Sequence, residues 1–255
     1  MTNKEIPLLF GSPKDKALFT AKEFIKKIKY YPPNEKTIVF FFGNTIYEEL
    51  VKKFGKKLKP ADSNKPAYFR VKIGKKKIIF IKSEIGAQSA ITRLEEAVAL
   101  KTKEIYFIGS IGALQEKKIG DIIIPTRAIR DEGTSYHYLK AGKYAYPNTT
   151  LTKKVRKECE KEKIEFECGT TWTIDAPYRE TIRKFEKYKK EGVIGVEMEA
   201  AALFAASKAL KVKVAGICWI SDVLHEKGWN PKFYTKEYFI GANKAFNVLL
   251  KVLEK

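Results

Sequence analysis

The sequence is short of the residues that build metal clusters and disulfide frameworks. It has three cysteines (Cys159, Cys168 and Cys218) and two histidines (His137 and His225), and it contains no HExxH pattern. These are too few for a disulfide framework or a histidine-based metal site, so we expect no metal. Cys159 and Cys168 could pair if the protein came from a hyperthermophile, where intracellular disulfides occur.

Long apolar runs and an N-terminal leader are also missing. No segment approaches the roughly 18 consecutive apolar residues of a membrane-spanning helix. Residues 1–10 lack a basic stretch followed by a long apolar run. We therefore expect a cytoplasmic protein with no membrane partner. Disorder is disfavoured as well, because 44% of the 255 residues are hydrophobic and 13% are aromatic.

The chain has few acidic residues relative to basic ones: it contains 50 Lys and Arg but 30 Asp and Glu, which gives a net charge of +20. Such an excess can indicate nucleic-acid binding. Here the lysines occur in ones, twos and threes along the whole chain rather than in a basic arm, and there are only two glutamines. The pattern favours a lysine-rich surface of the thermophile type, with no nucleic-acid partner and an attraction for anionic substrates such as phosphate.

Hydrophobic patterns alternate between strand and helix along the chain. Strands are predicted at 37–42, 68–73, 77–81, 104–108, 121–125, 165–171 and 213–220, and helices at 88–100, 197–210 and 236–253. No repeat or linker divides the chain, so we expect one domain over residues 1–255. The alternation predicts an open α/β sheet, in which ligands bind at the carboxyl ends of the strands.

Five short stretches, rich in polar or small residues, follow predicted strands or begin predicted helices. They are 83–89 (SEIGAQS), 109–113 (GSIGA), 127–138 (RAIRDEGTSYHY), 196–200 (VEMEA) and 220–222 (ISD). The first suits an anion at a helix N-terminus, but an ordinary turn with a serine cap explains it too. The glycines of the second would let backbone approach a ligand. The third is equally typical of a solvated loop.

Two acids in these stretches are candidates for chemistry. Glu199 enters a helix whose other turns are apolar, so its carboxylate needs partners, and paired sugar hydroxyls would serve. Its alternative role is the ordinary preference of an acid for a helix start. Asp222 ends an apolar strand, where an acid can protonate a leaving group or simply cap a turn.

The order and spacing of these stretches resemble the nucleoside phosphorylase family, which includes uridine phosphorylase, bacterial-type purine nucleoside phosphorylase and methylthioadenosine nucleosidase. The runs 85–86, 108–114 (IGSIGAL) and 120–125 (GDIIIP) carry the resemblance, and 196–200 followed by 220–222 is its most specific part. It extends from about residue 71 to the C-terminus, with residues 1–65 divergent. It implies a single three-layer α/β domain, a central mixed twisted sheet flanked by helices, and a homo-oligomer, either dimer or hexamer.

The resemblance also implies roles for individual residues. Asp222 would protonate the departing base, Glu199 would bind the ribose hydroxyls and Met198 would pack on the sugar. The further assignments are phosphate binding by Gly11, Gly86, Ser110 and Arg130, with Lys14 or Lys16 as additional cations, and base binding by Trp172, Tyr178 and Arg179. No cofactor is expected, and inorganic phosphate is the co-substrate.

These roles predict a pentosyltransferase of nucleoside salvage. It would cleave the N-glycosidic bond of a purine nucleoside, or of uridine, with phosphate, giving free base and ribose 1-phosphate. Phosphorolytic members usually carry an arginine where this chain has Phe107, so a hydrolytic nucleosidase of the same fold is the alternative. A catalytically inactive nucleoside-binding protein is the alternative of another class, and the intact Glu199 and Asp222 argue against it.

Overall fold

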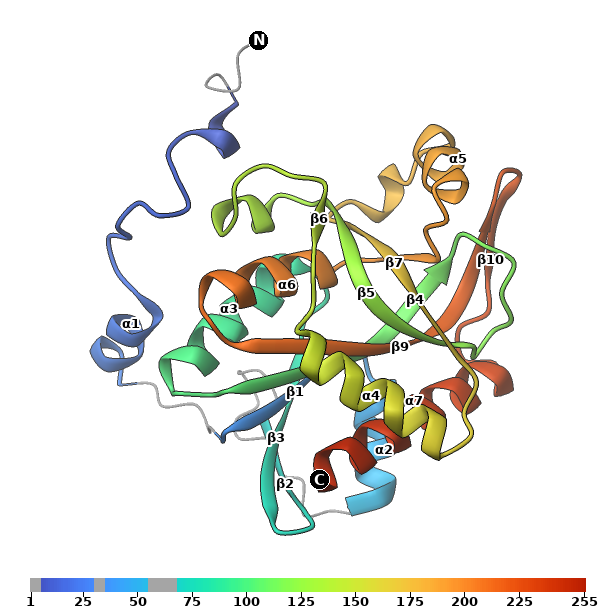
Figure 1. Cartoon of the computed structure of the whole chain (residues 1–255), viewed down its shortest axis with the longest axis horizontal. Helices are drawn as coiled ribbons and strands as arrows, with labels where there is room; N and C mark the ends of the chain where they lie inside the picture. Colours follow the sequence, from blue (N-terminus) through green and yellow to red (C-terminus); the bar gives the residue numbers. More distant parts are fainter. Residues whose placement is uncertain (1–5, 30–34, 55–67) are drawn as a thin grey trace.

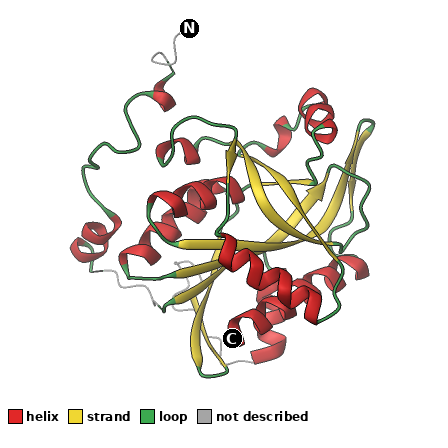
Figure 2. Cartoon of the chain, viewed as in Figure 1, coloured by secondary structure: helices red, strands yellow, loops and turns green. Residues whose placement is uncertain are grey.

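The computed structural model describes residues 6–29, 35–54 and 68–255, and Figures 1 and 2 show how their strands and helices are arranged. The strands are β1 (Thr37–Phe42), β2 (Tyr68–Ile73), β3 (Lys76–Ser83), β4 (Glu104–Ala113), β5 (Ile122–Asp131), β6 (Tyr144–Ala145), β7 (Phe166–Ile174), β8 (Gly195–Glu197), β9 (Lys213–His225) and β10 (Gly228–Pro231). The helices are α1 (Ala21–Lys27), α2 (Thr45–Phe54), α3 (Ala87–Ala99), α4 (Thr149–Lys161), α5 (Ile182–Lys190), α6 (Ala200–Ala209) and α7 (Lys236–Glu254), with short 3-10 turns η2 (Pro7–Leu9), η4 (Thr134–His137) and η5 (Pro177–Arg179).

One mixed sheet contains all of these strands. Its order is β10-β9-β5-β7-β8-β4-β1-β3-β2, with β6 paired to β5. Because β4 also pairs with β9, the strands β4, β9, β5, β7 and β8 close into a ring. The open sheet predicted from the alternation is therefore wrong for this half of the molecule, since no pattern within one strand specifies a second neighbour.

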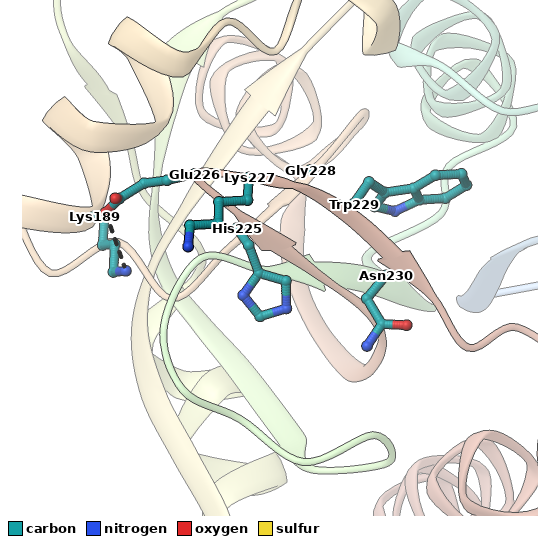
Figure 3. Close-up of a pocket in the computed structure, with 7 residues that line it drawn as sticks. All are labelled: Lys189, His225, Glu226, Lys227, Gly228, Trp229 and Asn230. Carbon is teal, nitrogen blue, oxygen red and sulfur yellow. Dashed lines mark ion pairs between the residues drawn. The ribbon is translucent and has the colours of Figure 1, made fainter.

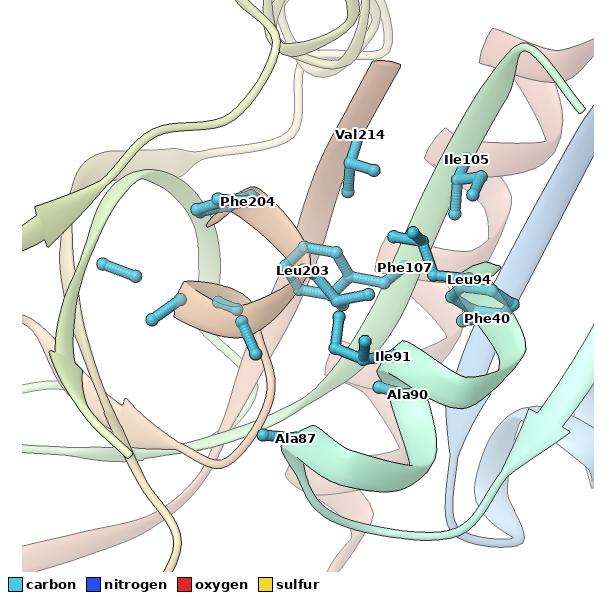
Figure 4. Packing of buried hydrophobic residues seen from close by; sticks show 14 of the residues in the cluster. Phe40, Ala87, Ala90, Ile91, Leu94, Ile105, Phe107, Leu203, Phe204 and Val214 are labelled. Carbon is cyan, nitrogen blue, oxygen red and sulfur yellow. The ribbon is translucent and has the colours of Figure 1, made fainter. Parts of the chain in front are cut away.

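Helices cover both faces of the sheet (Figure 1), which confirms the three-layer α/β architecture. On one face, α3 and α6 pack against each other, α3 lies against β3, and α6 lies against β5, β7 and β9. Leu94, Ile91, Leu203 and Phe204 surround Phe107 of β4 in this core (Figure 4). On the other face, α2, α4 and α7 cover a second core. Burial on both faces explains why the central strands are almost wholly apolar.

Phe107 stands where the resemblance would place a phosphate-binding arginine, and it is a core residue. It is 2% exposed, and its ring centroid lies 5.8 Å from that of Phe204. It fits because Gly216, its partner on β9, has no side chain: a Cβ there would lie 2.1 Å from Phe107 Cζ. An aromatic ring in this space is compatible with a glycine neighbour and contributes apolar packing rather than charge.

Several strands continue beyond the ranges predicted from sequence. β4 runs through the GSIGA stretch, β5 runs on to Asp131, and β9 runs past Asp222 to His225. The ring supplies the reason, because β4 pairs with β9 along all of its residues, including Ser110 opposite Trp219. The polar stretches thus lie on strand ends that are paired, rather than in free loops.

The three cysteines are free thiols, so the suggested Cys159–Cys168 disulfide is not formed. Burial raises the pKa of Cys159 to about 12 and raises that of Cys218 as well. Within the described part of the chain, no helix is long and apolar enough to cross a membrane.

Candidate active site

Strand β4 is the centre of the candidate site because it pairs with β1, β8 and β9. Gly112 of β4 pairs with Val196 on β8 and with Asp222 on β9, and Val196 pairs in turn with Trp172 on β7. A Cβ at Gly112 would lie 2.8 Å from Asp222 Oδ2, so this glycine leaves the space that the carboxylate occupies. The ring of strands therefore brings the VEMEA and ISD stretches to the same end of β4.

Glu197 is a buried carboxylate that organises the start of α6. Its Oε2 accepts the backbone N–H groups of Glu199 and Ala200 at 2.7 and 2.6 Å. Its Oε1 accepts the hydroxyls of Thr171 and Thr173 at 3.2 and 2.5 Å. These donors satisfy the carboxylate and fix the backbone on which Glu199 is mounted. The sequence reasoning assigned Glu197 no role, although an acid directly before the helix was visible.

Glu199 lies against the turn before α3. It is the N-cap residue of α6, and its Oε1 accepts the backbone N–H of Gly86 at 2.7 Å. Gly86 has a φ of 113°, a conformation that suits glycine. Burial, and then the charge of Glu197, raise the pKa of Glu199 to about 8. Met198 is partly exposed between the two acids. Two of the predicted site regions, Gly86 and Glu199, are thus brought into direct contact.

Asp222 is 7% exposed, and both of its oxygens accept hydrogen bonds. Ser221 Oγ donates to Oδ1 at 2.5 Å, and Trp229 Nε1 donates to Oδ2 at 2.7 Å. Trp229 belongs to β10, is 58% exposed, and lines a hollow of about 500 Å³ along the β9–β10 hairpin (Figure 3). The sequence did not predict this role for Trp229. The feature that could have indicated it is its position, as an aromatic residue directly after Gly228.

Ser110 lies on the face of β4 that is covered by α2 and α7. Its hydroxyl hydrogen-bonds the phenol of Tyr238, and the Tyr238 hydroxyl lies 3.0 Å from Thr45 Oγ1. Thr45 is the first residue of α2, which follows β1 after the two-residue turn of Gly43 and Asn44. The hydroxyls of Ser110 and Thr45 are therefore joined through one phenol at adjacent strand ends.

The turn between β1 and α2 was also missed. β1 lies between β3 and β4, so its carboxyl end adjoins both Ser110 and the Gly86 turn. Gly43 has a φ of 75°, and a Cβ there would meet nothing within 4 Å. Lys82 Nζ donates to Asn44 Oδ1 at 2.6 Å. This turn thus combines an open backbone with a nearby cation, which is the kind of environment that suits an anion.

Gly11 lies elsewhere, on the N-terminal segment that precedes α1. Within its own turn, Asp15 Oδ2 accepts the backbone N–H of Ser12 at 2.7 Å, so a carboxylate already fills the place of an anion. Across residues 6–29, 35–54 and 68–255, no hydrogen bond joins this turn to Gly86 or Ser110. The Gly11 turn is therefore closed by its own hydrogen bonds, and a role of Gly11 in phosphate binding stays a prediction.

Arg130, predicted to bind phosphate, is buried and hydrogen-bonded within the protein. It is 5% exposed, and its guanidinium donates to Ser135 Oγ and to the carbonyls of Leu139 and Lys140 at 2.8, 3.0 and 2.7 Å. It also lies over the ring of Tyr136 at 4.4 Å. These contacts hold the loop after β5 in shape, so Arg130 acts as an internal clamp rather than a free phosphate ligand.

Among the predicted base-binding residues, Trp172 is buried in the core, where a base cannot reach it. It is 0% exposed, its Nε1 donates to Asp131 Oδ2 at 2.8 Å, and its ring centroid lies 4.9 Å from that of Tyr188. Stacking of Trp172 on a base is therefore ruled out by burial. Tyr178 and Arg179 are exposed on η5, and their role stays a prediction.

The family model of the phosphorylase superfamily matches residues 37–254. The chain belongs to the phosphorylase superfamily. The match begins at β1, so the segment that carries Gly11 precedes the family region.

Curated relatives of this superfamily member are nucleoside phosphorylases by name. Guanosine phosphorylase of Halorubrum lacusprofundi is 28% identical over 141 residues, 55% of this chain and 58% of that enzyme. A DeoD-type purine nucleoside phosphorylase of Buchnera aphidicola subsp. Acyrthosiphon pisum is 28% identical over 162 residues, 60% of this chain and 66% of that enzyme. The matched regions thus span about 58 to 66% of the length of these relatives.

Solved structures show the same fold. Purine nucleoside phosphorylase of Toxoplasma gondii, in complex with immucillin-H, superposes with a TM-score of 0.77 at 22% identity, over 86% of this chain and 90% of that one. Uridine phosphorylase of Vibrio fischeri ES114 gives a TM-score of 0.74 at 21% identity, over 86% of this chain and 91% of that one.

Proposed function

We propose that this phosphorylase-superfamily member is a nucleoside phosphorylase, a cytoplasmic pentosyltransferase of nucleoside salvage. It cleaves a purine nucleoside, or uridine, with phosphate, and releases the base and ribose 1-phosphate. The observation that carries the proposal is the convergence of Glu199, Asp222 and Ser110 on the end of β4. The names of its relatives support the same chemistry.

The geometry supports a division of labour along β4. Glu199, held by the Gly86 N–H, offers a carboxyl group to the ribose hydroxyls, and Met198 lies beside it for the apolar face of the sugar. As the C1′–N bond lengthens, positive charge develops on the sugar and electron density moves into the base. We assign Asp222, on the strand that neighbours Gly112, as the acid that protonates the departing base.

Phosphate attacks C1′ from the face opposite the base. We place it at the Gly43 turn and Ser110, with Lys82 as the cation, in place of Gly11 and Arg130. The support is that these groups meet at adjacent strand ends beside the Gly86 turn. Phe107 is the observation that favours hydrolysis as the second candidate, because an apolar ring stands where an arginine would bind phosphate.

We also propose that the protein is a homo-oligomer, a dimer or hexamer. Large apolar side chains are exposed outside the cores, among them Leu18 and Phe19 on the N-terminal segment and Tyr146 near β6. Contact with another copy would cover such side chains.

A panel of inosine, guanosine, adenosine and uridine with phosphate tests the proposal, with free base as the readout. Asp222→Asn should lower turnover by about 10²–10⁴-fold, the usual contribution of a general acid, with a smaller effect on nucleoside binding. Glu226→Gln, a neutralisation on the same hairpin at a largely exposed side chain, is the matched control and should change little. An Asp222→Asn variant within threefold of wild type would contradict the role of Asp222.

A further inference from the structure

The strand next to Asp222 supplies a residue that contacts its carboxyl group. β10 pairs with β9 in antiparallel register, with Pro231 opposite Asp222 and Trp229 opposite Leu224. Trp229 is therefore the diagonal neighbour of Asp222 on the same face of the hairpin, a spacing that a large aromatic side chain can bridge. Pro231, directly opposite, has no polar side chain that could compete for the carboxyl group. The register thus places Trp229 to reach Asp222.

Trp229 directs its indole N–H inward although much of the residue is exposed. It is 58% exposed, yet its Nε1 donates to Asp222 Oδ2 at 2.7 Å. Its ring centroid lies 6.0 Å from that of Phe233, and Phe233 lies 6.3 Å from the ring of Tyr238 on α7. Water could satisfy the N–H of an exposed tryptophan. Because the N–H points at a buried carboxyl group instead, we take the hydrogen bond, rather than burial of the ring, as the contribution of this residue.

The carboxyl group of Asp222 needs partners that fix its orientation. The last torsion of an aspartate is broad and roughly two-fold, so the side chain does not set the plane of its own oxygens. Gly112 beside Oδ2 has no side chain to hold this oxygen, and a Cβ there would lie 2.8 Å from it. Ser221 donates to Oδ1 at 2.5 Å, and Trp229 donates to Oδ2. One donor on each oxygen fixes the plane of the group.

We propose that Trp229 is the positioning residue of Asp222, whose indole N–H sets the plane in which the carboxyl group meets the departing base. The inference rests on the proposed function. Trp229 takes no part in making or breaking bonds, and the proton passes from Asp222 to the base. A general acid works only within hydrogen-bond reach of the atom that it protonates, and a misplacement of about 1 Å can cost about 10²-fold in rate. Loss of the indole N–H should therefore lower turnover more than it weakens nucleoside binding.

Two substitutions at Trp229 separate the hydrogen bond from the packing of the ring. Trp229→Phe keeps a six-membered aromatic ring and removes the N–H. Trp229→His removes the six-membered ring and keeps an N–H, because Nε2 of an imidazole has the same place in its five-membered ring as Nε1 of an indole. Base release is measured with saturating phosphate at about pH 8, where an imidazole of ordinary pKa is neutral.

Trp229→Phe should lower kcat by about 10- to 100-fold, with the KM for the nucleoside near the wild-type value. Trp229→His should recover about tenfold of that loss, because it restores the donor. A residue that only packs or stacks would give the opposite order, since phenylalanine keeps more of the apolar ring. Two results would overturn the proposal: a Trp229→Phe variant with kcat within threefold of wild type, or a Trp229→His variant slower than Trp229→Phe.

A second experiment needs no turnover. Of the three tryptophans, Trp172 and Trp219 are 0% and 1% exposed, so Trp229 is the exposed one. In proton–nitrogen NMR, the indole proton of Trp229 should exchange with water more slowly in wild type than in Asp222→Ala, where its acceptor is gone. Glu226→Gln, on the same hairpin, is the control and should exchange as wild type does. Equal exchange in wild type and Asp222→Ala would overturn the proposal.

Failure of this inference and failure of the proposed function give different results. If wild type releases no base from any nucleoside, the proposed function fails, and the exchange measurement still decides whether Trp229 holds the carboxyl group of Asp222. If wild type is active and Trp229→Phe is unimpaired, the function stands and Trp229 has no part in it.

Discussion

The carboxyl groups of Glu197 and Glu199, at the start of α6, accept different numbers of hydrogen bonds. Glu197 accepts two backbone N–H groups and two threonine hydroxyls, whereas the Glu199 side chain accepts one backbone N–H, from Gly86. Burial raises the pKa of both groups; the four donors to Glu197 oppose that rise, whereas the charge of Glu197 adds to the rise for Glu199. A protonated Glu199 can both donate and accept a hydrogen bond, as two vicinal sugar hydroxyls require.

This difference predicts a pH dependence of stability. The pKa of Glu199 is raised from 4.5 to about 8, so its contribution is fully present below 4.5 and is lost as the pH rises to about 8. The free energy of unfolding of wild type should fall over that window relative to Glu199→Gln, by a few kcal/mol at about 1.4 kcal/mol per pKa unit. Urea denaturation at a series of pH values measures it, and a constant difference between the two proteins would refute it.

The phosphate site predicts a selective effect at Lys82. Lys82→Ala removes the cation beside Asn44, and a charged hydrogen bond is worth about 1.5–3 kcal/mol. The KM for phosphate should rise about 10- to 100-fold, while the KM for the nucleoside stays near the wild-type value. Lys77→Ala, an exposed lysine on the same strand, controls for lost charge. Equal effects of the two variants would show that only general positive charge matters.

Some residues of the candidate site could be predicted from the sequence and others could not. Glu199 and Asp222 were found because acids inside apolar segments need an explanation, and the structure buries both. Lys82 and Trp229 were missed because their contacts, to Asn44 and Asp222, depend on which strands are neighbours.

At the scale of elements, a glycine on one strand determines how large a side chain the paired residue on the neighbouring strand can have. Gly216 on β9 leaves room for the Phe107 ring on β4, and the ring in turn fills the space under α6. The apolar periodicity predicted most strands and the helices α3, α6 and α7, the last almost to the residue, but it missed α4, which is as long as α3. Strand ends were predicted too short, because the hydrogen-bonding partners that extend β4 and β9 come from ring closure.

Gly216→Ala should therefore be destabilising. The added Cβ would lie 2.1–2.4 Å from three ring carbons of Phe107, and overpacking of a core typically costs about 1–3 kcal/mol. Phe107→Leu in the same chain should recover part of the loss, giving a favourable coupling energy. Gly142→Ala is the control, because its Cβ would meet its nearest atom at 3.6 Å. Thermal unfolding of Gly216→Ala, Phe107→Leu, the double variant and Gly142→Ala measures the effect, and a Gly216→Ala protein as stable as Gly142→Ala would contradict this packing.

At the scale of the whole molecule, the closed ring of strands is what assembles the site. It places β7, β8, β4 and β9 side by side, so that Glu199 and Asp222 come from two separate stretches of sequence to one strand end. The net charge of +20 favours the approach of anions to the molecule without fixing their orientation. Orientation has to come from Ser110, Lys82 and the Gly43 turn.

The requirement for phosphate tests the central proposal most directly. Purified protein is incubated with inosine in phosphate-free buffer, phosphate is then added, and free base and sugar products are followed together. We predict negligible base release before the addition, and afterwards release matched one to one by ribose 1-phosphate. Base release at full rate without phosphate, with free ribose accumulating, would show that the protein is a nucleosidase and that the phosphate site proposed here is wrong.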